Sequence, residues 1–255
     1  MFRFLLMILC LFGTCIPVMS QGVVIGQDES ADVVDHTSFD SLWKESTVRG
    51  KLLTTGWNSM AYRNYRNVLS TARPSAFLPN SRAAFWVNAY LACLLEIMHL
   101  RTGYRSTMWD SLWLMRDTFE VAGRGLTLRD MVAEATIAAG TAGIVSCLPT
   151  GSSSGAPLPP RAAYAKNVRI LMRDQLRRIC RSERYLLYDP AGKVLQASAF
   201  FIPLQEAMKN EAGSLPRWVL PFVTDGVAAQ MALGANSITT FVHDRIETWR
   251  KARPP

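Results

Sequence analysis

Residues 83–100 read A-A-F-W-V-N-A-Y-L-A-C-L-L-E-I-M-H-L, and this stretch decides the fold. The length of the stretch and its lack of breakers predict an α-helix that is apolar on almost every side. Its polar interruptions are Asn88, Glu96 and His99. At about 100° per residue, they fall within roughly 80° of one helical face. Because an unpartnered polar group is costly in a core, we expect the rest of the chain to surround this helix and satisfy that polar face.

The composition is that of a folded protein with a positive charge. The chain has 255 residues, 49% of them hydrophobic, and a net charge of +8. This apolar content excludes a disordered protein and suits one large domain or two small ones. The charge suits an anionic partner such as lipid headgroups. Nucleic acid is not favoured, because no nucleic-acid-binding motif is present. We expect no cofactor.

The first twenty residues have the features of an export signal. Arg3 supplies the positive start, the apolar run ends at Val18, and the small exit region ends at Ser20, before Gln21. The apolar run is about 15 residues, shorter than the roughly 20 that span a membrane. The sequence therefore predicts a protein that is secreted or held in the lumen of the secretory pathway. A signal that is retained instead would anchor the protein to the membrane.

The remaining chain predicts a mobile leader over residues 21–38 and a single globular domain over residues 39–255. Helices are predicted over residues 39–48 (capped by Ser38), 64–72, 83–100 (capped by Asn80 or Ser81), 106–115, 128–138 and 161–181. The C-terminal third is also predicted to be helical. A tight hairpin or a strand–turn–helix start is predicted at 118–128, a hairpin at 185–196, and a buried strand at 143–148. This pattern indicates a helix-rich α+β fold, with a central buried helix and a small sheet or hairpins.

Three blocks of sequence follow one another in a recognisable order. They are A-F-W-V-N-A-Y at 84–90, T-F-E-V-A-G-R-G-L-T-L-R-D-M at 118–131, and I-V-S-C at 144–147, which a Pro-rich loop follows. Together they resemble the DUF-547 domain family, and the resemblance covers about residues 39–201. The family has no settled activity, so the resemblance implies a type of domain and not a reaction.

The polar residues of that family pattern are only partly retained. Those present are Asn88, Tyr90, Asp130 and Cys147. Where the family has a second Asn, a Glu-His pair, a strand His and a second Cys, this chain has Leu91, Val132-Ala133, Ala142 and, nearby, Gly155. A cysteine nucleophile needs a lowered pKa, usually from a nearby His. These losses favour a non-catalytic binding or interaction domain with a degenerate site.

Two other functions remain open. One is a thiol-dependent hydrolase or transferase, with Cys147 as nucleophile and His99 or His243 as base. The other is a membrane-surface adaptor that works through the helix predicted at 161–181. On that helix five cations fall within roughly 120° of one another. They are Lys166, Arg169, Arg173, Arg177 and Arg181, here called the basic ridge, and they are the candidate anion-binding residues.

The other candidate binding residues are Asn88, Tyr90, Glu96, His99 and Asp130. Glu96 and His99 are three residues apart, so they could form an acid/base couple or a structural hydrogen bond. One such pair supplies too few ligands for a metal, and no metal site is predicted. Beyond the signal, the cysteines are Cys93, Cys147 and Cys180. Three thiols can form at most one disulfide, and the sequence leaves open whether they do.

Overall fold

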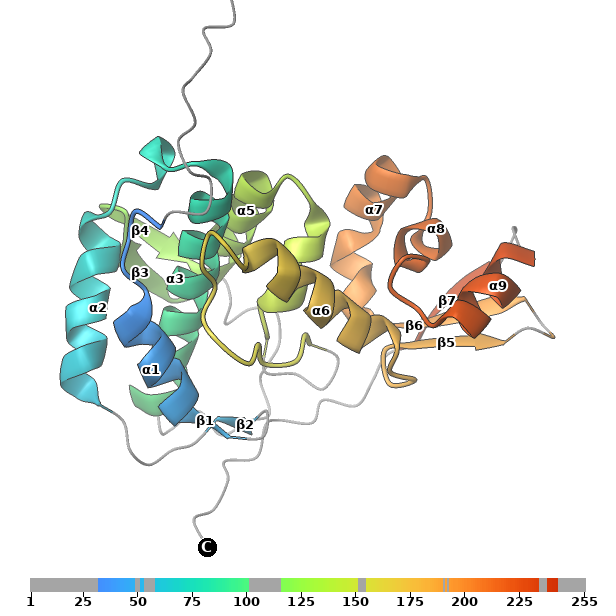
Figure 1. Ribbon diagram of the computed structural model, residues 1–255, viewed down its shortest axis with the longest axis horizontal. Helices are drawn as coiled ribbons and strands as arrows, with labels where there is room; N and C mark the ends of the chain where they lie inside the picture. The colour runs from blue at the N-terminus through green and yellow to red at the C-terminus, as the bar shows by residue number, and fades with distance from the viewer. Residues whose placement is uncertain are drawn as a thin grey trace, which may run out of the picture.

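The computed structural model describes residues 32–48, 51–52, 58–100, 116–150, 155–189, 191, 193–233 and 238–242. Helices predominate in this part of the chain, and the strands form two hairpins and a small three-stranded sheet (Figure 1). The fold is therefore the helix-rich α+β class that the sequence predicts. None of the described helices is long and apolar enough to cross a bilayer.

The elements follow one another in this order. The α-helices are α1 (Thr37–Ser46), α2 (Ser59–Thr71), α3 (Pro79–Leu100), α5 (Leu128–Ala139), α6 (Val168–Cys180), α7 (Gln205–Ala212), α8 (Leu215–Val219) and α9 (Asp225–Leu233). The 3-10 helices are η1 (Pro74–Ala76), η2 (Ala142–Cys147) and η3 (Ala199–Leu204). The strands are β1 (Thr47–Val48), β2 (Lys51–Leu52), β3 (Thr118–Val121), β4 (Arg124–Thr127), β5 (Leu186–Asp189), β6 (Val194–Ser198) and β7 (Ile238–Val242).

Helix α3 is the centre of the fold. Every residue from 83 to 95 is buried, and the helix packs against α2, α5, α6 and η1 (Figure 1). It begins at Pro79, a favourable first position because that N–H would have no partner within a helix. The predicted caps Asn80 and Ser81 are therefore wrong, since both residues lie inside α3.

The β3–β4 hairpin and the start of α5 confirm two predictions. Ala122 and Gly123 have φ of 54° and 68°, the left-handed values that a tight type I′ hairpin turn needs. Their N–H groups donate to the carbonyls of Leu69 (2.9 Å) and Ser70 (2.7 Å), near the end of α2. The turn thus satisfies carbonyls that the helix leaves open. Thr127 and Asp130 then form a capping box that starts α5.

Two hydrophobic clusters meet at α6. The first surrounds α3, and the second lies among η3, α7, α8 and the β5–β6 hairpin. Helix α6 contributes Leu171 to the first cluster and Leu176 to the second, while Met172 and Val145 contact both. In Figure 1, α6 accordingly lies between the two groups of elements. The packing of α6 therefore joins the halves of the described structure.

The predicted strand at 143–148 is wrong, because these residues form the 3-10 helix η2. Gly140 ends α5 in the left-handed conformation (φ 64°). The Thr141 side chain then accepts a hydrogen bond from Gly143 N at 3.1 Å and caps η2. The residues are buried as expected, but a short apolar run fits a buried helical turn as well as a strand.

Several predicted boundaries also need correction. Helix α1 starts at Thr37, so Ser38 lies inside it and is not its cap. Helix α2 starts five residues before the predicted 64–72, at a point where Asn58 accepts a hydrogen bond from Ala61 N at 3.0 Å. The prediction of a helix over 161–181 is wrong before Val168, because side chains from elsewhere bind that backbone. The predicted helix at 106–115 lies outside the described residues.

The C-terminal third is not helical throughout. The β5–β6 hairpin forms as predicted, with antiparallel pairing of Leu186 to Ala197 and of Asp189 to Val194. Strand β7, which the sequence analysis missed, pairs in parallel with β6. Its residues, I-T-T-F-V, are β-branched or aromatic, which is the composition of a strand.

The leader prediction for residues 21–38 is wrong in the part that the structure describes. His36 is only 1% exposed, and its Nδ1 lies 2.7 Å from the Tyr65 hydroxyl. Its ring meets those of Tyr65 and Tyr164 edge-on. Val34 is buried as well. The hydrogen bond and these apolar contacts fix this stretch on α2, and residues 21–31 lie outside the described part.

Acidification should destabilise the fold through His36. Burial lowers the pKa of His36 to about 4, from 6.5, so the unfolded chain takes up the proton first as the pH falls. The stabilisation that comes from keeping His36 neutral is fully present above pH 6.5, and it is lost progressively as the pH falls towards 4. We expect a loss of about 2 kcal/mol in the free energy of unfolding between pH 7 and pH 5. Urea unfolding at the two pH values measures it.

The variant His36→Gln is the control, because it keeps a polar group beside Tyr65 and cannot titrate in this range. Its free energy of unfolding should change with pH by about 2 kcal/mol less than that of the wild type. The other histidines are present in both proteins, so their contribution to the pH dependence of unfolding is the same in each and drops out of the difference. Equal pH dependence in the two proteins would show that His36 does not contribute in this way.

Candidate functional site

Asn88, one of the polar residues of the family-like pattern, binds backbone through both ends of its amide. It is fully buried on α3. Its Nδ2 donates to the Ala163 carbonyl at 2.7 Å, and its Oδ1 accepts from Ala163 N at 2.8 Å. Both polar ends of the amide are therefore occupied by one residue, 75 positions further along the chain. The Asn88 amide therefore links α3 to this distant stretch of backbone.

Asn88 is one of several side chains that hold residues 155–165, here called the tethered segment. This segment contains no helix or strand, although most of it is buried. Backbone groups that a helix or strand would pair internally must then find other partners. Those partners come from α1, α3 and α6 and from the residues that flank them, so the segment is fixed by side chains on elements far apart in sequence.

The first half of the tethered segment is rich in proline and is bound through its carbonyls. Tyr185 Oη donates to Gly155 O at 2.9 Å. Three more donors bind consecutive residues: Gln175 Nε2 to Pro157 O at 2.8 Å, Arg178 Nη1 to Leu158 O at 3.3 Å, and Trp43 Nε1 to Pro159 O at 2.8 Å. Proline has no N–H but keeps its carbonyl. This stretch therefore needs side chains that donate hydrogen bonds to its carbonyl groups.

The second half is bound mainly through its N–H groups. Asp40 Oδ1 accepts from Ala162 N at 2.8 Å, Asn167 Oδ1 from Tyr164 N at 2.8 Å, and Asp32 Oδ1 from Ala165 N at 2.7 Å. Asn88 binds Ala163 between them. These acceptors satisfy the N–H groups of a stretch that has no secondary structure, and α6 starts only at Val168. The sequence does not predict the tethers from Asp32, Asp40 and Gln175, because an Asp or Gln gives no sequence signal of binding a distant backbone, whereas an Asn on an apolar helix already suggests a hydrogen bond to backbone.

Tyr90 and Asp130 also have structural partners. Tyr90 is buried and donates from its hydroxyl to the Pro149 carbonyl at 2.8 Å, and burial raises the pKa of its phenol. Asp130 accepts from Thr127 N at 2.8 Å in the capping box of α5, and these hydrogen bonds lower the pKa of its carboxyl.

Cys147 lies at the end of η2 and is completely buried. Its Sγ is 4.0 Å from Ser146 Oγ. Burial raises the pKa of the Cys147 thiol to about 12, whereas a nucleophilic cysteine needs a lowered pKa. Cys93 and Cys180 are likewise buried free thiols, and burial raises the pKa of each to about 12. Burial and a raised pKa are typical of cysteines that pack in a hydrophobic core.

Glu96 connects α3 to α2. It accepts a hydrogen bond from the Tyr62 hydroxyl and lies 3.4 Å from Arg66 Nε. Arg66 also places Nη1 at 3.4 Å from Cys93 Sγ. Glu96 thus takes part in a network between two packed helices. The His99 side chain lies outside the described residues, so the Glu96–His99 couple stays a prediction.

The basic ridge is divided by the structure. Arg169 Nε donates to Asn80 Oδ1 at 2.9 Å, and its Nη1 donates to the Ala139 carbonyl at 2.7 Å, at the end of α5. Lys166 precedes α6, and its Nζ is 5.9 Å from the centre of the Tyr164 ring. Arg169 therefore holds the fold together, and Lys166 is not on the helix.

Of the remaining members of the basic ridge, Arg173 and Arg177 lie on the outer face of α6, and Arg181 directly follows the helix. Arg173 and Arg181 are exposed, and neither forms an ion pair with a described residue. The Arg177 guanidinium is 3.8 Å from Asp174, a long and exposed pair. Such a pair contributes little. This face keeps an available positive charge.

No family model, no curated protein and no solved structure matches the chain. The resemblance to the DUF-547 family therefore stays a prediction. Within the described residues, no group of three or more His, Cys, Asp or Glu side chains is placed to hold a metal. The function of the candidate site is therefore inferred from the geometry of its residues.

The buried environment predicts that Cys147 resists alkylation in the folded protein. A rise in the thiol pKa from 9.0 to about 12 leaves about a thousandfold less thiolate at neutral pH, and the thiolate is the form that reacts. Iodoacetamide labelling followed by peptide mass spectrometry should show slow modification of Cys147 in the native protein and rapid modification in urea. The variant Ser59→Cys, which places a thiol at an exposed position, supplies the reference rate. Native Cys147 labelling at that reference rate would contradict the structure-based assignment.

Proposed function

We propose that this chain is a non-catalytic binding domain whose family-like polar residues serve as scaffold. The observation that carries the proposal is the Asn88 amide, which is fully buried and bonded through both ends to Ala163. The tethered segment packs directly against Asn88, where a substrate cleft would need space. A thiol-dependent reaction is not favoured, because the Cys147 thiol is enclosed and its pKa is raised.

The binding surface that the geometry favours is the outer face of α6. Arg173 and the half-buried Arg177 lie on it, the exposed Arg181 directly follows the helix, and Asp174 is the acidic residue among them. Ile170, on the same face, is 44% exposed. An apolar residue among arginines suits a membrane surface with anionic headgroups, where each basic residue contributes about 1 kcal/mol. The proposed partner is therefore an anionic lipid surface, bound weakly and in a salt-dependent manner.

Export belongs to the same proposal. It rests on the arginine and the apolar run in residues 1–20, which lie outside the described residues. An exported protein would meet an anionic surface from the luminal or outer side of a membrane. Retention of the signal would bring α6 to that surface, whereas its removal would leave binding to the basic residues alone.

Reversal of charge on α6 should abolish binding to anionic vesicles. The triple variant Arg173→Glu, Arg177→Glu, Arg181→Glu replaces attraction by repulsion on one face. Co-sedimentation with phosphatidylcholine vesicles that contain phosphatidylserine should fall at least about tenfold relative to the wild type. Pure phosphatidylcholine vesicles give the background, including any contribution from the apolar N-terminus. Binding by the wild type should also weaken as salt is added.

The matched control reverses three exposed cations elsewhere: Arg63→Glu, Lys193→Glu and Lys209→Glu. It changes the net charge by the same amount, so vesicle binding that depends only on net charge would fall equally. We expect this control to retain most of the wild-type binding. Equal loss in the two triple variants, or unchanged binding in the α6 variant, would overturn the assignment of this face.

A further inference from the structure

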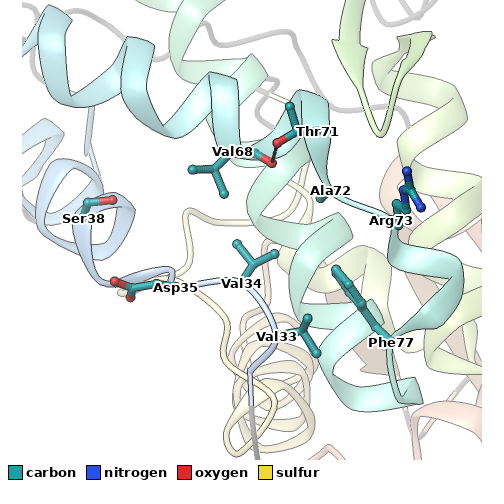
Figure 2. Close-up of a pocket in the computed structure, with 9 residues that line it drawn as sticks. All are labelled: Val33, Val34, Asp35, Ser38, Val68, Thr71, Ala72, Arg73 and Phe77. Carbon is teal, nitrogen blue, oxygen red and sulfur yellow. Dashed lines mark hydrogen bonds between the residues drawn. The ribbon is translucent and has the colours of Figure 1, made fainter.

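A groove of about 460 Å³ opens beside the N-terminal end of the described chain. Its walls come from the residues that precede α1 together with Ser38, from the end of α2, and from Arg73 and Phe77 on either side of η1, as Figure 2 shows. The volume falls within the range of small-ligand sites. The groove contains no member of the basic ridge and no family-like residue, so it is a separate feature of the surface.

Apolar side chains make up more than half of the groove lining, and Ser38 and Thr71 are polar members of it. Val33 and Val68 are 63% and 42% exposed, while Val34 and Phe77 are buried beneath them. Ala72 completes the wall on the side of α2. Large apolar side chains left in water on facing walls gain free energy when a ligand covers them. The lining therefore favours a ligand with apolar side chains.

The two ends of the groove carry opposite charges. Asp35 lies at one end and Arg73 at the other, with the valines between them (Figure 2). Hydrogen bonds from Thr37 lower the pKa of the Asp35 carboxyl, which therefore stays ionised. Arg73 is exposed, and it forms no ion pair within the described part of the chain. Arg73 is therefore available to a ligand group of opposite sign, and the Asp35 carboxylate keeps its negative charge while one of its oxygens accepts from Thr37 N at 2.8 Å.

We propose that this groove binds a short apolar peptide with free termini. The peptide ammonium lies at Asp35, the peptide carboxylate lies at Arg73, and the apolar side chains cover Val33, Val68 and Phe77. An apolar chain with one charged end would satisfy only one of the two groups. The site is independent of the face of α6, so either proposal can fail without the other.

Isothermal titration calorimetry with tetrapeptides tests the proposal. The probes carry Val, Leu or Phe at the two central positions and have free termini. They should bind with one site per chain. Acetylation of the amine or amidation of the carboxylate should each weaken binding about threefold to fivefold, the size expected for an exposed ion pair. Peptides blocked at both ends should bind weakest.

Variants assign the binding to this groove. Arg73→Gln should make the protein insensitive to amidation of the peptide, and Asp35→Asn should make it insensitive to acetylation. Val68→Glu, at an exposed position, should weaken binding at least about tenfold, because it places a charge on the apolar wall. The matched controls, Arg63→Gln and Ile137→Glu, alter exposed residues outside the groove and should bind like the wild type.

Several outcomes would overturn the proposal. One is the absence of binding by any of the tetrapeptides, and another is equal binding by free and doubly blocked peptides. Binding of decanoate without binding of peptides would assign the groove to a fatty acid instead. Self-association that Val68→Glu abolishes, measured by sedimentation velocity, would assign it to a second copy of the chain.

Discussion

The structure depends on a run of buried backbone that has no secondary structure of its own. The tethered segment crosses the centre of the molecule, and its proline-rich half cannot pair as a helix or a central strand. Each hydrogen bond to it adds a net stabilisation of only about 1 kcal/mol, but an unmet buried carbonyl or N–H costs about 1–3 kcal/mol. The fold therefore requires the whole set of donors and acceptors. Asn88 is the central member, because it satisfies both groups of Ala163 from the most deeply buried helix.

This requirement explains the roles of residues that look functional in the sequence. An Asn on an apolar helix, a Tyr near it and a buried Cys are common parts of an active site, yet here the first two bind backbone and the third has a raised pKa. Because these residues serve the scaffold, the two surfaces that we propose for recognition lie on the outside of the molecule. One is the arginine face of α6, and the other is the groove beside α2. The proposed face of α6 lies on an element that donates two of the tethers, from Gln175 and Arg178.

The parts that the sequence predicts correctly are those set by near neighbours. The burial of α3 follows from its continuous apolar run, the β3–β4 turn from Ala-Gly-Arg-Gly, and the capping box from the spacing of Thr127 and Asp130. The missed parts depend on distant partners. The N–H of Ala165 donates to Asp32, which is 133 positions away in the sequence. No local sequence pattern predicts that hydrogen bond. The same cause accounts for the late start of α6 and for the packed residues 32–38, while Gly143–Cys147 shows that apolar content alone does not separate a strand from a 3-10 turn.

Hydrogen exchange at the amides of Ala162, Ala163 and Ala165 is the most direct test of this account. These amides lie outside helices and strands, so their protection has to come from Asp40, Asn88 and Asp32. Exchange measured by NMR should be at least about a hundredfold slower than in an unstructured peptide, and Asn88→Ala should accelerate Ala163 more than helical amides at the centre of α5. Rapid exchange of all three amides in the native protein would contradict the account, because it would show a loop that the side chains do not hold.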